Sequence, residues 1–238
     1  MIKLEHEVTL SPEQWRMVIM GARNAMNSWD RSDSEIKYEN VRDNTGKFVM
    51  GQNDLALMMR LRNAGTDHRK FMRMIVVYID ITAPLYWWKE FDTYKVGTVA
   101  NSCSTMHKIH AKEFTLEDFS CEKLAYPALD QLRHTINTLN VYRDLFVNWD
   151  KKDDNSKNAL LVGTGHDDGY DKKDAWHQMI QLLPSSYNQK RTVMLNYEVL
   201  ANIYKSRKNH KLDEWRELCK WIESLPYSEL ITGEVTNA

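Results

Sequence analysis

Residues 183–216, which read LPSSYNQKRTVMLNYEVLANIYKSRKNHKLDEWR, decide the fold. The apolar and β-branched residues of 189–195 predict a strand, and the residues that follow keep a helical spacing. On a helix that begins at Asn196, one face is formed by residues at steps of three and four, which are Leu200, Ile203 and Arg207. A strand that leads directly into a helix, with a second helix after it, indicates an α+β protein.

The sequence before this stretch predicts further helices and strands. Ser11-Pro12-Glu13 is a helix start, because serine caps, proline fits the first turn and glutamate interacts favourably with the helix dipole. Pro127 lies near the start of the longest helical pattern, so that helix can begin there. Helices are expected after residue 11 and over 54–63, where Gly65 is a C-terminal cap, and over 85–91, 122–149 and 175–183. Strands are expected over 2–10 and 71–81, and loops over 28–50, 94–107 and 150–174.

The composition limits the class of protein. A chain of 238 residues with 42% hydrophobic residues has material for one sizeable core, so we expect a single domain over residues 1–238. The net charge of −1 argues against a nucleic-acid partner, which usually requires a basic stripe. The apolar run 74–79 is too short to cross a bilayer, so no membrane partner is expected. Three cysteines, an odd number, predict reduced thiols in a cytoplasmic protein.

Four residues could in principle form a zinc site. His107 and His110 are one helical turn apart, and Cys103 and Cys121 lie on either side of them. The cysteines are not in a paired, closely spaced motif, so small apolar cysteines and solvated imidazoles are the favoured interpretation. A thiolate nucleophile at Cys103 would need a base beside it, and the sequence places none there. The sequence therefore predicts no metal site.

The closing stretch resembles that of the flavin-dependent thymidylate synthases, also called thymidylate synthase complementing proteins. In that family a Leu-Pro pair and a tyrosine precede a strand, and an Asn-x-Arg-x-Leu sequence then opens a helix that ends at an arginine. Glu198 stands where the family has the arginine of Asn-x-Arg. The residues that align with the family motif are Asn196, Leu200, Arg207, His210, Glu214 and Arg216. The alignment needs a deletion of about one residue before His210.

A second block, residues 65–107, resembles the same family in the order of its elements. The family motif is Arg-His-Arg-x-x-Ser-x-Asn-Glu-x-Ser-x-Arg, and only Asn101 and Ser104 match it outright, while Lys95 keeps a cation. A serine replaces the motif glutamate, and the three motif arginines are replaced by Tyr94, Val96 and Met106. The chain is therefore expected to be a divergent member of the family, with a mixed sheet and long helices.

The resemblance implies a reaction and its ligands. The reaction is the reductive methylation of dUMP to dTMP, with FAD as cofactor and with NADPH and methylenetetrahydrofolate as co-substrates. Ser104 and Arg207 would bind the pyrimidine nucleotide, and the flavin contacts would be His68, Asn101, Asn196 and Asn202. The family uses no side-chain nucleophile, so no catalytic residue is assigned, and its active sites form between subunits of a homotetramer.

Two alternatives remain open at this point. The chain could keep the fold as a nucleotide-binding or assembly protein without turnover, or with altered specificity, because a phosphate loses charge-assisted hydrogen bonds when arginines are lost. Arg207 could pair with Glu214 or Asp213 instead of a ligand.

A separate prediction concerns assembly. The helix over 85–91 holds many large rings, and aromatic residues are enriched at protein interfaces. We therefore expect part of the cluster to lie at a subunit interface, among Tyr86, Trp87, Trp88 and Phe91.

Overall fold

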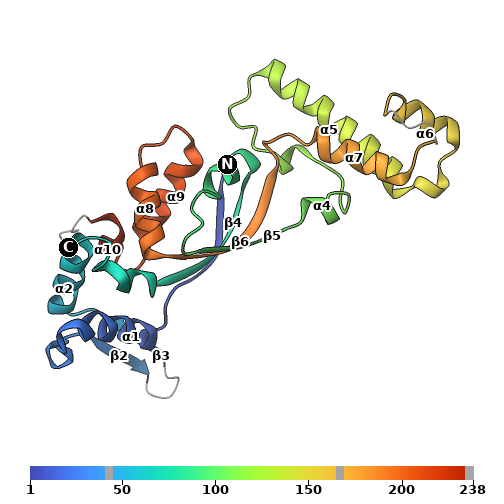
Figure 1. Ribbon diagram of the computed structural model, residues 1–238. Helices are drawn as coiled ribbons and strands as arrows, with labels where there is room; N and C mark the ends of the chain where they lie inside the picture. Colours follow the sequence, from blue (N-terminus) through green and yellow to red (C-terminus); the bar gives the residue numbers. More distant parts are fainter. Residues whose placement is uncertain (41–44, 165–168, 234–238) are drawn as a thin grey trace. The chain divides into compact units, whose positions relative to one another are not determined.

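The computed structural model describes residues 1–40, 45–164 and 169–233, and the chain forms two compact units (Figure 1). The sheet unit comprises Ile2–Ile81, Phe91–Asn101 and the segment from Arg191 onward. The helical unit comprises Met1, Thr82–Glu90 and Ser102–Lys190. The single domain that the sequence predicts over residues 1–238 stays a prediction.

The larger sheet has four strands. They are β1 (Lys3–Val8), β4 (Val76–Pro84), β5 (Thr98–Ser102) and β6 (Asn188–Asn196), in the order β1-β4-β6-β5. Burial alternates along β4, where Val77 and Ile79 are buried and Tyr78 between them is 46% exposed. Successive side chains of a strand point to opposite faces, so one face of β4 packs into the core while the other is open. Helices and strands together confirm the α+β class.

A hairpin lies within residues 28–50, where a loop was expected, and that prediction is wrong. β2 (Glu35–Asn40) and β3 (Thr45–Val49) pair antiparallel. The alternating pattern is easy to overlook, because few large apolar side chains are spread over two short strands. Phe48 stacks on Trp15 of the first helix, with ring centroids 5.9 Å apart, and this contact anchors the hairpin.

The first helix begins as the sequence predicts. Ser11 caps α1 (Pro12–Arg23): its hydroxyl accepts a hydrogen bond from the Gln14 amide, and the Gln14 side chain accepts one from the Ser11 amide. α2 (Gln52–Asn63) confirms the next predicted helix, and the chain turns after it at Gly65, whose φ is +106°.

A buried ion pair joins α1 to α2. The Nε of Arg23 donates to Oδ1 of Asp54 at 2.5 Å, and the two side chains are 4% and 0% exposed. The hydroxyls of Ser32 and Ser34 donate to the other carboxylate oxygen at 2.7 and 2.6 Å. Burial by itself raises the pKa of Asp54, but the hydrogen bonds from Ser34, Ser32 and Arg23 outweigh it, so this pKa is lowered.

Two element boundaries differ from the prediction. The strand expected over 71–81 begins later, at β4, and a 3-10 helix, η3 (Arg69–Arg73), takes the earlier residues. Phe71 and Met72 are buried in η3, which explains their apolar character without a strand. The loop expected over 94–107 is wrong as well, because it contains β5 and the short α4 (Thr105–Lys108).

The C-terminal helices complete the core of the sheet unit. α8 (Tyr197–Arg207) follows β6 directly and lies beside α9 (Asp213–Ser224) in Figure 1. Trp215, Leu218 and Ile222 are fully buried and recur at helical spacing on α9. The short α10 (Glu229–Thr232) follows.

The helical unit centres on two packed helices, α5 (Tyr126–Val147) and α7 (Lys172–Leu182). α5 confirms the longest predicted helix and holds Pro127 in its first turn. The loop expected over 150–174 is corrected by α6 (Asp154–Leu161), and residues 165–168 lie outside the described part. The 3-10 helices of the chain besides η3 are η1 (Asn24–Met26), η2 (Trp29–Arg31), η4 (Leu116–Asp118) and η5 (Trp149–Lys151).

The aromatic helix α3 (Leu85–Phe91) is buried within the chain itself. Trp87, Trp88 and Phe91 are at most 1% exposed, and the indole N–H of Trp88 donates to the Gln189 carbonyl at 2.9 Å. A side chain without exposed area cannot contribute area to a subunit interface. Trp87, Trp88 and Phe91 are therefore excluded from such an interface, whereas Tyr86 is half-buried, and its place at an interface stays a prediction.

Candidate functional site

Arg207, the predicted nucleotide-binding residue, lies at the C-terminal end of α8 between two aromatic rings. Its guanidinium carbon is 4.7 Å from the ring centroid of Trp215 and 5.7 Å from that of Tyr94. The Nε of Arg207 also donates to the Tyr94 hydroxyl at 2.9 Å. Phe91 stacks on the Trp215 ring, with centroids 6.4 Å apart, and fixes that ring. The arginine is thus half-buried and held in an aromatic clamp formed by Tyr94 and Trp215.

A hollow of about 330 Å³ opens beside the aromatic clamp. It is lined by Phe91, Asp92, Tyr94, Lys95 and Thr98. Lys95 brings an exposed cation to it. The buried hydroxyl of Thr98 has no hydrogen-bond partner among the described residues. An aromatic ring, a cation and an unsatisfied hydroxyl give the hollow the chemistry of a small polar ligand site.

Asn196, a predicted flavin contact, caps α8. Its Oδ1 accepts a hydrogen bond from the Val199 amide at 2.9 Å, and the residue is 8% exposed. The Asn196 amide nitrogen also lies against Gly97, where a Cβ atom would come within 2.3 Å of it. Gly97 has a φ of +80°, so glycine is favoured there for both reasons. Asn196 therefore caps α8 and packs against the turn that carries Tyr94 and Lys95, which is a structural role that the sequence did not predict.

A charged cluster formed by Glu198, Arg69 and Arg73 joins the first turn of α8 to η3. Glu198 accepts hydrogen bonds from the Nε of Arg69 at 3.1 Å and from the Nε and Nη2 of Arg73. Burial raises the pKa of Glu198, but the bonds from both arginines outweigh it, and its pKa is lowered. His68, a predicted flavin contact, directly precedes η3 and is exposed. The cluster carries one excess positive charge next to His68.

The remaining predicted residues are at the surface of their units. Asn101 on β5 and Asn202 on α8 are exposed residues of the sheet unit. Ser104 belongs to the helical unit, where it caps α4 by accepting a hydrogen bond from the His107 amide at 3.0 Å. Asp213 lies against Arg216, and a pairing of Arg207 with Glu214 stays a prediction.

Sequence reasoning missed Trp215 as a partner of Arg207, and it missed Arg69 and Arg73. The dense basic run HRKFMR at 68–73 was an available signal for the arginines. The contact of Arg207 with Tyr94 had no such signal, because these residues are 113 positions apart in the chain.

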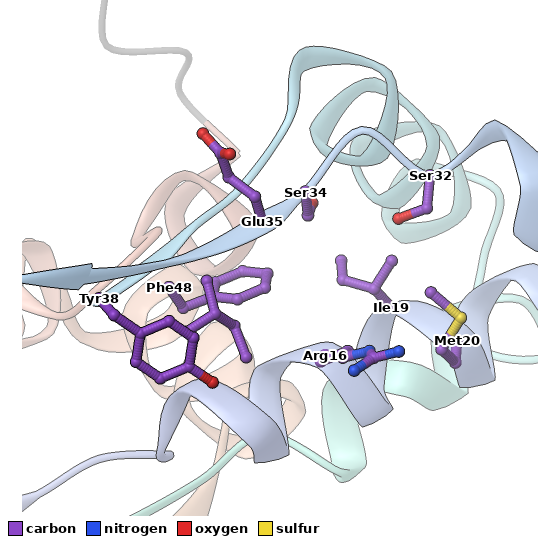
Figure 2. A pocket seen from close by; sticks show the side chains of 9 residues that line it. Arg16, Ile19, Met20, Ser32, Ser34, Glu35, Tyr38 and Phe48 are labelled. Atoms are coloured by element: carbon purple, nitrogen blue, oxygen red, sulfur yellow. The ribbon is translucent and has the colours of Figure 1, made fainter. Parts of the chain in front are cut away.

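Two other hollows of the sheet unit contain none of the predicted residues. Figure 2 shows the first, of about 330 Å³, where Arg16, Ile19 and Met20 of α1 face side chains of the hairpin region. The second, of about 840 Å³, is lined in part by Arg31 and Arg60.

Neither a metal-binding group nor a membrane-spanning helix is found among the described residues. The part of the chain that the structure describes contains no group of three or more His, Cys, Asp and Glu side chains arranged to hold a metal ion. Cys103, His107, His110 and Cys121 are all described, so the zinc alternative finds no support. None of the described helices has the length and apolarity that crossing a membrane requires.

Comparisons with known proteins identify the fold. The sequence matches no protein-family model and no curated protein. Among solved structures, it is similar to thymidylate synthase X (ThyX) from Helicobacter pylori with FAD and dUMP, with a TM-score of 0.58 and 16% identity, over 98% of this chain and 97% of that one. A second structure, flavin-dependent thymidylate synthase ThyX from Helicobacter pylori complexed with FAD and dUMP, has a TM-score of 0.56 at 16% identity, over 98% of both chains. This chain therefore has a fold similar to that of the flavin-dependent thymidylate synthases.

Proposed function

We propose that this chain binds FAD and a pyrimidine nucleotide and catalyses the reductive methylation of dUMP to dTMP. The observation that carries the proposal is the position of Arg207. A half-buried guanidinium lies beside a hollow that also contains Lys95 and Thr98, in a fold shared with proteins crystallised with FAD and dUMP. A guanidinium can polarise a pyrimidine carbonyl by donating hydrogen bonds from its planar, always charged fork, which a lysine cannot reproduce.

The residues proposed for the flavin fit such a group in their chemistry. His68, Asn101 and Asn202 are exposed and can donate hydrogen bonds to a ring or a ribose. FAD, when bound, supplies hydride transfer, and the protein orients it. Glu198 orients Arg69 through its Nε and Arg73 through its Nε and Nη2, so both terminal nitrogens of Arg69 and the Nη1 of Arg73 are proposed to bind the diphosphate. Glu198 stands where the family has an arginine, so one positive charge is missing there. Arg69 and Arg73, which bind Glu198, supply positive charge at the same place.

The nucleotide is proposed to bind at Arg207 of the sheet unit, with NADPH and methylenetetrahydrofolate as co-substrates, and a nucleotide contact of Ser104 stays a separate prediction. Tyr94 and Val96 lack the guanidinium groups that the resemblance leads one to expect. Lys95 is then the cation of this turn that remains for the phosphate, and one lysine cannot make the paired bonds of an arginine. The affinity for dUMP is therefore expected to be low. The homo-oligomer that the resemblance implies is part of the proposal.

A second candidate, nucleotide binding without turnover, is favoured by one observation. The hydrogen bond from Arg207 to Tyr94 and the two ring contacts already hold the guanidinium in the absence of a nucleotide. If this clamp does not open, Arg207 cannot reach a substrate carbonyl.

A turnover assay decides between the two candidates. The purified protein is incubated with dUMP, FAD, methylenetetrahydrofolate and NADPH, and dTMP is quantified by chromatography. The proposal predicts dTMP in more than stoichiometric amount, and Arg207→Lys should abolish most of it. Nucleotide binding in calorimetry without any dTMP would favour the second candidate.

A variant pair tests the proposed flavin residues. Arg73→Gln should weaken FAD binding in equilibrium dialysis about tenfold, because a charge-assisted bond to the diphosphate is lost. Lys70→Gln is the matched control, since it removes the same charge from an exposed position of the same 3-10 helix. Equal effects of the two substitutions would refute a specific role for Arg73.

A further inference from the structure

A group of cations in the helical unit lies near the paired rings of His110 and Phe146. This ring packs against Phe146 of α5, with centroids 4.6 Å apart. The ammonium of Lys172, at the start of α7, lies 4.9 Å from the centroid of the same Phe146 ring. The Nε of Arg143, one turn before Phe146 on α5, donates to the His110 carbonyl at 3.0 Å. α5 and α7 therefore bring two cationic groups to the His110–Phe146 pair, and Lys108 lies two residues before His110 in the chain.

The positive charges of this group are not balanced by ion pairs. Lys108, Arg143 and Lys172 form no ion pair with any residue that the structure describes. Asp144, whose pKa Arg143 helps to lower, is hydrogen-bonded to Asn148 and paired with Lys152.

The two acidic residues near Lys172 in sequence are engaged as well. Asp171 and Asp174 accept hydrogen bonds from each other's backbone amides and cap α7. Their carboxylates interact with the backbone amides at the N-terminus of α7 and, in the described part of the chain, form no ion pair with Lys172.

The pKa of His110 responds to these nearby positive charges. Burial lowers its pKa first, and the charges of Lys108, Arg143 and Lys172 lower it further. The Nδ1 atom of His110 is buried and has no hydrogen-bond partner among the described residues. The neutral form of the ring is therefore favoured, and the nearby cations repel one another.

We propose that Lys108, Arg143 and Lys172 form a binding site for a small phosphate-type anion. A phosphate dianion placed among them would remove their mutual repulsion and accept charge-assisted hydrogen bonds from all three. Because the His110 carbonyl uses the Nε of Arg143, the two terminal nitrogens of this arginine can bind phosphate oxygens. The three cations are grouped near one pair of rings, whereas a nucleic acid requires a row of cations along its backbone.

This site is separate from the proposed function. All its residues belong to the helical unit, and none of them is a proposed contact of FAD or of dUMP. Failure of either proposal would leave the other standing, since inorganic phosphate is the probe here and neither FAD nor dUMP is present.

Calorimetric titration of the full chain with inorganic phosphate, and separately with pyrophosphate, tests the proposal. Saturable binding is expected for at least one of them, and Lys172→Gln and Arg143→Gln should each weaken it about tenfold. Lys173→Gln is the matched control, because it removes the same charge at the next, exposed position of α7. Arg143→Lys keeps the charge but loses the fork, and intermediate affinity is expected.

An NMR titration of His110 gives a second readout, which a purely structural role of these cations would not move. Bound phosphate offsets the cations, so the pKa of His110 should rise when phosphate is added to the wild type and should rise less in Lys172→Gln. Thermal melts check that each variant is folded, and Lys172→Gln keeps the test valid if Arg143→Gln unfolds. No binding at millimolar phosphate, an equal loss in Lys173→Gln, or binding of a DNA duplex without binding of either phosphate would overturn the proposal.

Discussion

Replacing Tyr94 by phenylalanine separates the two states of Arg207. The substitution removes the hydroxyl that accepts the Nε of Arg207 at 2.9 Å and leaves the ring beside the guanidinium in place. A hydrogen bond to a charged group contributes about 1.5–3 kcal/mol when buried. Because Arg207 is only half-buried, solvent screening reduces this, and we expect the free energy of unfolding to fall by about 1 kcal/mol.

The same substitution should improve nucleotide binding. If dUMP must draw Arg207 away from Tyr94, the bond that competes with the ligand is already gone in the variant. The free energy of about 1 kcal/mol that breaking this bond takes in the wild type is no longer needed. The affinity of the variant for dUMP should therefore be about fivefold higher than that of the wild type. Tyr78→Phe is the control, since Tyr78 is exposed on β4 and the same atom is removed.

The assay combines urea denaturation with calorimetric titration of dUMP on the wild type and both variants. Lower stability together with tighter dUMP binding supports an Arg207 that moves from Tyr94 to the ligand. Lower stability with unchanged dUMP affinity would refute the reasoning, because Arg207 would then have only a structural role in the aromatic clamp.

Two further substitutions test how the site is held. Gly97→Ala should lower stability by about 1–3 kcal/mol in a thermal melt, because φ is +80° and the new Cβ would lie 2.3 Å from the Asn196 amide nitrogen; an unchanged melting temperature would contradict this account of the turn. Asp54→Asn should cost about 3–5 kcal/mol in guanidinium denaturation at neutral pH, since Arg23 is left buried without its carboxylate. The pKa of Asp54 is lower in the folded state, so its contribution is fully present above the unfolded value and is lost as pH falls through the folded value. The stability of Asp54→Asn should therefore fall less than that of the wild type as the pH is lowered. Stability curves with the same pH dependence for both proteins would contradict this role of Asp54.

Local signals in the sequence predicted where several helices begin or end. Ser11 and Pro12 open α1, Pro127 lies in the first turn of α5, and Gly65 follows α2, because each of these residues has a strong preference of its own. The hairpin and β5 were missed, since short strands derive their stability from pairing with distant residues rather than from their own pattern.

The site was predictable only in part, for the same reason. Asn196 and Arg207 stand at opposite ends of α8, a helix that the spacing of residues predicted, while their roles in binding stay predictions. Glu198 and Arg69 are 129 positions apart, and no local pattern connects them. Contacts of this kind arise from the tertiary fold, which a single sequence does not specify by periodicity alone.

The most direct test of the central claim is a titration of the purified protein with FAD, followed by the quenching of flavin fluorescence. The account predicts saturable binding in the micromolar range, weaker in Arg73→Gln and unchanged in Lys70→Gln, because Arg69 and Arg73 supply cations that the turn at Tyr94 lacks. Absence of any saturable FAD binding by the folded wild-type protein, even at high micromolar FAD, would contradict the account.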